Sequence, residues 1–232
     1  VDTNAVGTYT VTYTSTDASG NAGTATRTVT VEDTTAPVFT SSASFSADEN
    51  QTAIGTVTAT DLQSVTFSVS GTELAITSGG VLTFVTAPDY ETKSSYTGTI
   101  TADDGVFTET QDVTININDL NDNDPVITSN TTFTVSENQT GVGQITVSDG
   151  DSNSSFTFAI VSDYEDGALF NVDSDGVITF KANANYETAG QYTIKVNISD
   201  GANTVAQIFT INLTNVCEFD FNNVVYTGEM IE

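Results

Sequence analysis

A short segment near the middle of this 232-residue chain carries a dense set of oxygen-bearing side chains. It reads Asp119-Leu120-Asn121-Asp122-Asn123-Asp124-Pro125. Carboxylate, carboxamide and backbone carbonyl oxygens are the ligands that calcium prefers, and the ion takes about six to eight of them. The closing proline cannot donate a hydrogen bond to a neighbouring strand, so the segment cannot continue a regular sheet. The sequence therefore predicts a calcium-binding connection between two folded parts.

The segment lies between two copies of one sequence repeat. Glu49-Asn50-Gln51-Thr52 returns 88 positions later as Glu137-Asn138-Gln139-Thr140. After an insertion in the second copy the displacement becomes 96, and Gly80-Val81-Leu82-Thr83-Phe84 returns as Gly176-Val177-Ile178-Thr179-Phe180. Self-similarity at a fixed displacement indicates repeated folding units. We therefore expect two homologous domains, residues 37–124 (the first repeat) and residues 125–216 (the second repeat).

Each copy is divided into short segments in which apolar and polar residues alternate. In the first copy they cover residues 51–60, 64–70, 80–86, 95–103 and 106–118. Alternation with period two predicts strands, and abundant Thr, Val, Phe and Tyr favour strands over helices. About seven strands in about 90 residues are typical of a Greek-key sandwich. We predict an all-β chain of tandem Greek-key β-sandwiches arranged as an extended rod.

Apolar residues at alternating positions are predicted to face the two cores. In the first repeat these are Phe45, Ile54, Val57, Phe67, Leu82, Phe84, Tyr96, Ile100, Val113, Ile115 and Ile117. In the second repeat they are Phe133, Val142, Ile145, Phe158, Phe170, Ile178, Phe180, Tyr192, Ile194, Val196, Phe209 and Ile211.

Residues 1–36 do not share the repeat. Residues 8–15 and 25–31 alternate with period two around a turn-rich connection, which predicts a β-hairpin. A two-stranded hairpin is marginally stable alone, so we expect the last hairpin of a sandwich whose earlier strands precede residue 1. The sequence of residues 7–21 and 33–37 resembles the C-terminal half of bacterial immunoglobulin-like modules, which occur in tandem on surface proteins.

Acidic residues dominate the charged composition. The chain has 31 Asp and Glu against four Lys and Arg, a formal net charge of −27. Nucleic acid is excluded as a partner because phosphate binding needs clustered Lys and Arg, and an anionic membrane surface is disfavoured for the same reason. Self-repulsion on this scale favours bound cations, although acidity would also keep a long surface protein soluble or suit a saline habitat.

Residue types that are absent or rare limit the chemistry further. The chain has no histidine and one cysteine, Cys217, so it lacks the usual general base, soft-metal ligands and an internal disulfide. We therefore predict that it is not an enzyme. It has neither an apolar run long enough to span a bilayer nor a signal peptide, and we expect an interior piece of a longer extracellular protein. Residues 217–232 are expected to begin a further module or to form a tail.

Further acidic clusters are predicted to reach the 119–125 segment from both repeats. The first repeat offers carboxylates early in a strand, in a mid-domain turn and at its exit: Glu49, Asp89, Glu91, Asp119 and Asp122. The second repeat offers Asp149, Asp151 and Asp200. Eight carboxylates around one linker would repel each other strongly unless divalent cations were bound among them.

These motifs closely resemble those of cadherin repeats. Adjoining cadherin domains are joined by calcium ions held by an early glutamate, an Asp-x-Glu, an Asp-x-Asn-Asp-Asn linker, an Asp-x-Asp and a late aspartate. The resemblance implies a first ion held by Glu49, Asp89, Glu91 and Asp122. It implies a second held by Glu49, Glu91, Asp119, Asp122, Asp151 and the Leu120 carbonyl. A third would use Asn121, Asp149, Asp151, Asp200 and the Asn123 carbonyl.

The other two junctions depart from this pattern. Before the first repeat the linker is replaced and Gln63 stands where the second aspartate of Asp-x-Asp is expected, but enough carboxylates remain for one ion: Asp33, Asp61 and Asp104. After the second repeat Asn215 and Cys217 fall where Asp119 and Asn121 fall in the first copy. A single weak site is expected there, beside Asn185, from Glu137, Glu187 and Glu218.

The sequence predicts a calcium-rigidified stalk segment of a large extracellular adhesin that supports cell adhesion. Two alternatives remain open at this point. The repeats could bind polysaccharide or their own kind directly, or the chain could be a protomer of a surface filament whose terminal strands complete neighbouring copies.

Overall fold

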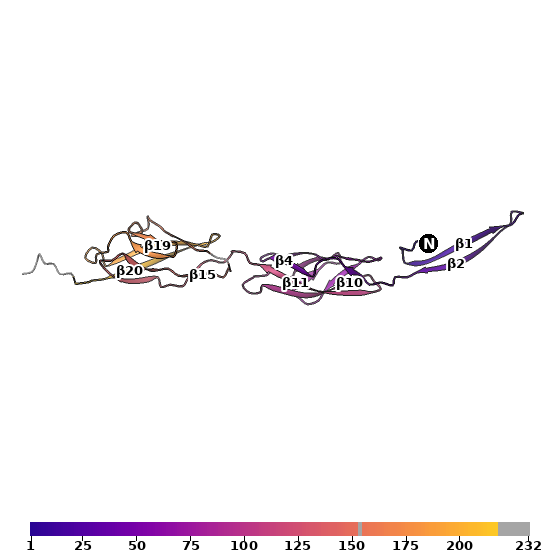
Figure 1. The fold of residues 1–232 in the computed structure, drawn as a ribbon, viewed down its shortest axis with the longest axis horizontal. Helices are drawn as coiled ribbons and strands as arrows, with labels where there is room; N and C mark the ends of the chain where they lie inside the picture. Colours follow the sequence, from indigo (N-terminus) through magenta and orange to yellow (C-terminus); the bar gives the residue numbers. More distant parts are fainter. Residues whose placement is uncertain (153–154, 218–232) are drawn as a thin grey trace, which may run out of the picture. The chain divides into compact units, whose positions relative to one another are not determined.

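The computed structural model describes residues 1–152 and 155–217, and it is almost entirely β-structure (Figure 1). The chain divides after Leu120 into two compact units, and each is described by itself below. Neither unit, within the described residues, contains a helix with the length and apolar character that a bilayer crossing needs. The predicted all-β class with tandem β-sandwich repeats is confirmed.

The first unit begins with an isolated hairpin. Strands β1 (Gly7–Thr16) and β2 (Ala22–Val31) pair antiparallel, with Tyr9 opposite Val29. The turn is closed by the Asp17 carboxylate, which accepts hydrogen bonds from the backbone N–H groups of Ser19 and Asn21 at 2.9 and 2.8 Å. Because this side chain organises the reversal tightly, β2 begins three residues before the predicted start at residue 25.

The first repeat consists of nine strand segments. They are β3 (Val38–Phe39), β4 (Ser44–Asp48), β5 (Ala53–Thr56), β6 (Ala59–Thr60), β7 (Thr66–Val69), β8 (Leu74–Ile76), β9 (Val81–Phe84), β10 (Ser95–Asp103) and β11 (Thr108–Asn118). One sheet has the order β4-β11-β10-β7 and a second the order β5-β9-β8, while β3 pairs with β6. The first long strand, β4, runs parallel to the last, β11.

The second repeat has the same arrangement. Its elements are β12 (Val126–Ile127), β13 (Thr132–Ser136), β14 (Gly141–Gln144), β15 (Val147–Ser148), β16 (Thr157–Ile160), η1 (Gly167–Leu169), β17 (Phe170–Val172), β18 (Val177–Phe180), β19 (Gln191–Ser199) and β20 (Thr204–Thr214). The sheets have the orders β13-β20-β19-β16 and β14-β18-β17, and β12 pairs with β15. The short 3₁₀ element η1 lies in the loop before β17, where the second repeat is longer than the first.

The prediction of one continuous strand over residues 51–60 is wrong. Residues 51–60 form two strands, β5 and β6, that belong to different sheets. The break falls at Val57, which is buried and donates its N–H to the carbonyl of Gly80 at 2.8 Å. Gly80 has φ +89°, and a Cβ there would lie 2.2 Å from the Val57 carbonyl oxygen. The glycine therefore lets the chain cross between sheets, which a simple alternation of residues does not reveal.

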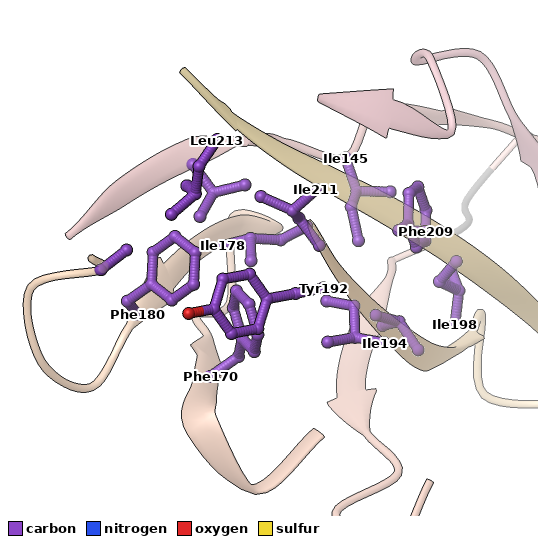
Figure 2. Close-up of a cluster of buried hydrophobic side chains, with 13 residues drawn as sticks. Ile145, Phe170, Ile178, Phe180, Tyr192, Ile194, Ile198, Phe209, Ile211 and Leu213 are labelled. Atoms are coloured by element: carbon purple, nitrogen blue, oxygen red, sulfur yellow. The ribbon is translucent and has the colours of Figure 1, made fainter. Parts of the chain in front are cut away.

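Every residue predicted to face a core belongs to one of two hydrophobic clusters, one per repeat. Figure 2 shows the second cluster, in which Tyr192 packs edge-to-face against Phe170 and Phe180, and Ile178 and Ile211 belong to the same cluster. The predictions omitted several buried residues, among them Leu74, Ile198 and Leu213. The two clusters hold each sandwich together and fix the loops at its ends.

Candidate metal sites

Glu49 is the centre of the acidic cluster at the exit of the first repeat. Its side chain is only 2% exposed, at the end of β4. One carboxylate oxygen accepts the N–H of Tyr90 at 2.7 Å and the other accepts the N–H of Leu120 at 2.8 Å. The carboxylate thus ties a mid-domain loop to the segment that leaves the domain, and it has lone pairs remaining for a cation.

Asp89 and Glu91 bring their carboxylates to Glu49, as predicted. Ligand oxygens of Glu49, Asp89 and Glu91 all lie within 4.8 Å of one another. Asp89 accepts hydrogen bonds from the hydroxyl and the backbone N–H of Thr92, and these bonds hold the pKa of Asp89 below its ordinary value. Three converging carboxylates form a favourable set of hard ligands for a divalent cation.

The remaining predicted residues of the first unit are Asp119 and Leu120, at the C-terminal end of that unit. Asp119 is half-buried at the exit, and Leu120 is 38% exposed. The N–H of Leu120 is taken by Glu49, so its carbonyl is the group left to serve as the predicted ligand.

In the second unit, Asp151 holds the linker residue Asn123. Asp151 is 7% exposed, and its two carboxylate oxygens accept the backbone N–H and the side-chain amide of Asn123 at 3.1 and 2.9 Å. Asp149 accepts the N–H of Asp151 through one oxygen, while its other oxygen is buried without a hydrogen-bond partner. The predicted Asp122 is exposed, and one of its oxygens accepts the side-chain amide of Asn123 at 3.2 Å.

Asp200 is a buried carboxylate of the second unit with one oxygen that lacks a hydrogen-bond partner. It is 5% exposed; one oxygen accepts the N–H groups of Ala202 and Asn203, and the other is buried without a hydrogen-bond partner. Burial opposes ionisation, but the bonds from Asn203 and Ala202 outweigh it and hold the pKa below its ordinary value. A buried anionic oxygen that lacks a donor is costly, and a cation would compensate it. The residues therefore fit the expected metal.

Asn203 was not predicted as part of this site. Its side-chain amide donates to the carbonyl of Asn123 at 2.8 Å, the group expected to bind the third ion, and Asn121 donates to the carbonyl of Asp200 at 3.2 Å. The first repeat has Phe107 at the corresponding position, 96 residues earlier, so the repeat comparison gave no signal for it.

The predicted first-junction residues also come together. Carboxylate oxygens of Asp33, Asp61 and Asp104 lie within 4.8 Å of one another. Asp104 accepts the N–H groups of Val106 and Phe107 through one oxygen, and Asp61 accepts the N–H groups of Leu62 and Gln63. The second oxygens of Asp33 and Asp104 are buried without hydrogen-bond partners. This cluster is compatible with one cation, the number expected there.

The exit of the second repeat reproduces the hydrogen bonds around Glu49. Glu137 is 3% exposed and accepts the N–H groups of Val216 and Tyr186, both at 2.8 Å. These two hydrogen bonds hold the pKa of Glu137 below its ordinary value. The flanking carboxylates are reduced, however, because Asn185 and Asn215 stand where the first repeat has aspartates.

At the exit of the second repeat, the carboxamides of Asn215 and Asn185 form hydrogen bonds with neighbouring residues. The side-chain amide of Asn215 donates to Glu187 at 3.0 Å, and Asn185 accepts the N–H of Thr188 at 2.9 Å. Glu218, the third predicted ligand, lies outside the described residues. Within residues 1–152 and 155–217, Glu137 and Glu187 are not part of any group of three metal-ligating side chains.

Two families match parts of the chain. Residues 131–214 match the model of the cadherin domain. Residues 1–31 match the model of a bacterial surface protein, Ig-like domain. The first repeat has the same sheet orders as the second repeat, which contains the matched residues. The predicted resemblance to cadherin-like repeats preceded by a bacterial immunoglobulin-like module is confirmed.

Curated relatives are animal protocadherins. The chain is 37% identical to human Protocadherin Fat 4 over 127 residues, which is 51% of this chain and 2% of that protein. It is 36% identical to human Protocadherin-11 X-linked over 157 residues, 63% of this chain and 11% of that protein. The chain thus spans only a small part of the curated relatives that it matches.

Solved cadherin structures share the fold. Human Protocadherin-24 EC1-2 aligns with a TM-score of 0.65 at 19% identity, covering 78% of this chain and 98% of that one. Mouse clustered PcdhgC3 EC1-3 aligns with a TM-score of 0.67 at 22% identity, covering 90% of this chain and 77% of that one. The two repeats therefore have a cadherin-like fold.

Proposed function

We propose that this chain is a non-enzymatic stalk segment of a large adhesin on a bacterial surface, made stiff by calcium at the 119–125 linker. The observation that supports the proposal is that predicted ligands either converge or keep buried oxygens without hydrogen bonds. Glu49, Asp89 and Glu91 converge in the first unit, while Asp149 and Asp200 each keep a buried oxygen without a hydrogen bond in the second. The match of residues 1–31 to a bacterial surface family supports the location.

The cadherin pattern distributes the ligands among about three ions. Eight carboxylates contribute: Glu49, Asp89, Glu91, Asp119, Asp122, Asp149, Asp151 and Asp200. Three divalent ions would bring eight negative charges to a net of about −2, a balance at which attraction exceeds repulsion. The Asp33, Asp61 and Asp104 cluster would take one further ion at the first junction.

Stiffening follows from linkage. Carboxylates that share ions in an aligned arrangement, and repel one another in a splayed one, favour alignment by RT ln(1 + [L]/Kd) for each independent site. Extracellular modules bind calcium with dissociation constants on the order of 10⁻⁴ to 10⁻³ M. The linker would therefore be stiff at extracellular calcium concentrations and flexible at cytosolic ones.

Small-angle scattering of the whole chain with calcium and with a chelator tests this proposal. We expect the maximum dimension to be sharply defined with calcium and broadly distributed without it. The variant with Asp149→Asn and Asp200→Asn should resemble the chelated wild-type chain even when calcium is present. Identical profiles with and without chelator would contradict the proposal. Asp163→Asn, in an acidic loop assigned no ion, serves as the control and should keep the full response.

A further inference from the structure

The second repeat has a pocket that belongs to none of the predicted metal sites. Its volume is about 300 Å³, and it lies between the loop before β17 and the loop after β18. The lining is mainly apolar, and Phe180, Tyr192 and Leu169 contribute to it. The polar side chains of the lining are those of Lys181, Asn183, Asn185 and Thr188, together with the Tyr192 hydroxyl. A mostly apolar cavity with a few polar groups is the usual form of a small-molecule site.

The first repeat has equivalent backbone hydrogen bonds at the position that corresponds to this pocket. The N–H of Lys181 donates to the carbonyl of Leu169 at 2.9 Å, as Val85 donates to Glu73 at 2.9 Å. The N–H of Ala189 donates to Asn185 at 3.2 Å, as Lys93 donates to Asp89 at 2.9 Å. Leu169 therefore corresponds to Glu73, and Ala189 corresponds to Lys93.

The side chains at these two positions differ in charge between the repeats. The ammonium of Lys93 lies 4.2 Å from the centre of the Tyr96 ring and pairs with Glu73 at 2.5 Å. The second repeat has leucine and alanine instead, so no such ion pair lies over Tyr192, which is itself buried, whereas Tyr96 is half-buried. The aromatic pair beneath is the same, with centroids 5.0 Å apart for Phe84 and Tyr96 and 5.2 Å apart for Phe180 and Tyr192.

The hydroxyl of Tyr192 indicates the chemistry of an occupant. The residue is 8% exposed and lines the pocket, and Figure 2 shows its phenol oxygen beside the Phe180 side chain. Among the described residues the side chain of Tyr192 contacts Phe170 and Phe180 through its ring, and its hydroxyl makes no hydrogen bond to the protein. A purely apolar occupant would leave it unsatisfied at a cost, whereas an occupant with its own hydroxyl groups would satisfy it.

The polar groups of the pocket disfavour a cationic occupant. The lining residues include no carboxylate, so a cation would find no opposite charge there. The Lys181 ammonium is engaged by the Ala168 carbonyl at 2.6 Å. Amides, a hydroxyl and aromatic side chains remain, and they suit a molecule that has both C–H surface and hydroxyl groups. We propose that this pocket binds one pyranose ring of a polysaccharide, a function separate from the calcium-dependent stalk.

The test is to titrate the ¹⁵N-labelled 232-residue chain with a panel of neutral pyranose monosaccharides and to screen the same chain on a glycan array. We expect amide shifts confined to residues 181–192 for at least one sugar. Closing the pocket with Leu169→Glu and Ala189→Lys, the pair found in the first repeat, should weaken binding at least about tenfold. Tyr192→Phe keeps the ring and should weaken binding roughly fivefold through the lost hydrogen bond.

The matched control makes the reverse exchange, Glu73→Leu and Lys93→Ala, and should leave binding in the second repeat unchanged. The proposal is overturned if no sugar binds, if the closed variant binds as well as the wild type, or if only apolar probes such as indole shift these amides. Chelation of calcium should not abolish the shifts, which separates this result from the outcome of the stalk experiment.

Discussion

Glu49 and Glu137 have the same position in the two repeats and make the same pair of backbone hydrogen bonds. Glu49 accepts from Tyr90 and Leu120, and Glu137 accepts from Tyr186 and Val216. The residues around them differ, because aspartates at the first exit are replaced by Asn185 and Asn215 at the second. The buried glutamate therefore serves the fold in both repeats, and we propose that its neighbours determine how many cations each exit can bind.

The largest expected effect is the loss of calcium response when the first exit is made to resemble the second. With calcium about tenfold above its dissociation constant at three sites, the wild-type chain should gain about 4 kcal/mol of stability. Asp89→Asn combined with Asp119→Asn should retain less than half of that gain. Calorimetric melting with calcium and with chelator measures it. An unchanged calcium-dependent rise in Tm would show that these aspartates are not ligands.

The reciprocal exchange should create a response. Asn185→Asp with Asn215→Asp restores the carboxylates beside Glu137, and one new site at tenfold excess of calcium would add about 1.4 kcal/mol. Without calcium the same variant should be less stable than wild type, because the hydrogen bond from Asn215 to Glu187 is replaced by repulsion. Urea unfolding in both conditions measures both effects, and a variant insensitive to calcium would contradict the comparison.

The shared structural role predicts similar losses at both glutamates in the absence of calcium. Glu49→Gln should cost about 2 kcal/mol, because the amide end cannot accept the second N–H. Glu137→Gln should destabilise the second repeat in the same direction. Denaturant unfolding with chelator measures the losses, and Glu109→Gln, at an exposed position, is the control. A loss at Glu49 no larger than the loss at the control would refute the structural role.

The smallest effect is the pH dependence of the calcium-free chain. The pKa values of Asp89, Glu137 and Asp200 are held below their ordinary values of 3.8, 4.5 and 3.8. Each contributes stability that is present above the ordinary value and is lost as pH falls through the lower, folded value. Stability should therefore decline below about pH 4.5, and Glu137→Gln should flatten the upper part of that decline. Unfolding curves across this range provide the measurement.

Internal repetition made much of this predictable. Alternation of apolar and polar residues identified the core positions, and the displacement of 88 aligned Glu49 with Glu137. Alternation alone could not show that residues 51–60 change sheets, because the crossing depends on the close approach of Gly80 to Val57. Nor could it reveal Asn203 or the pocket beside Tyr192, since both depend on residues that differ between the copies.

The parallel pairing of the first and last long strands has a mechanical consequence. In the first repeat β4 lies beside β11 over Ser44–Asp48, and in the second β13 lies beside β20 over Thr132–Ser136. Tension applied through the two ends of a repeat pulls these neighbouring strands in opposite directions along their length. Their hydrogen bonds are then loaded in shear and must yield together rather than one at a time. Each sandwich should therefore resist stretching well beyond what its modest size suggests.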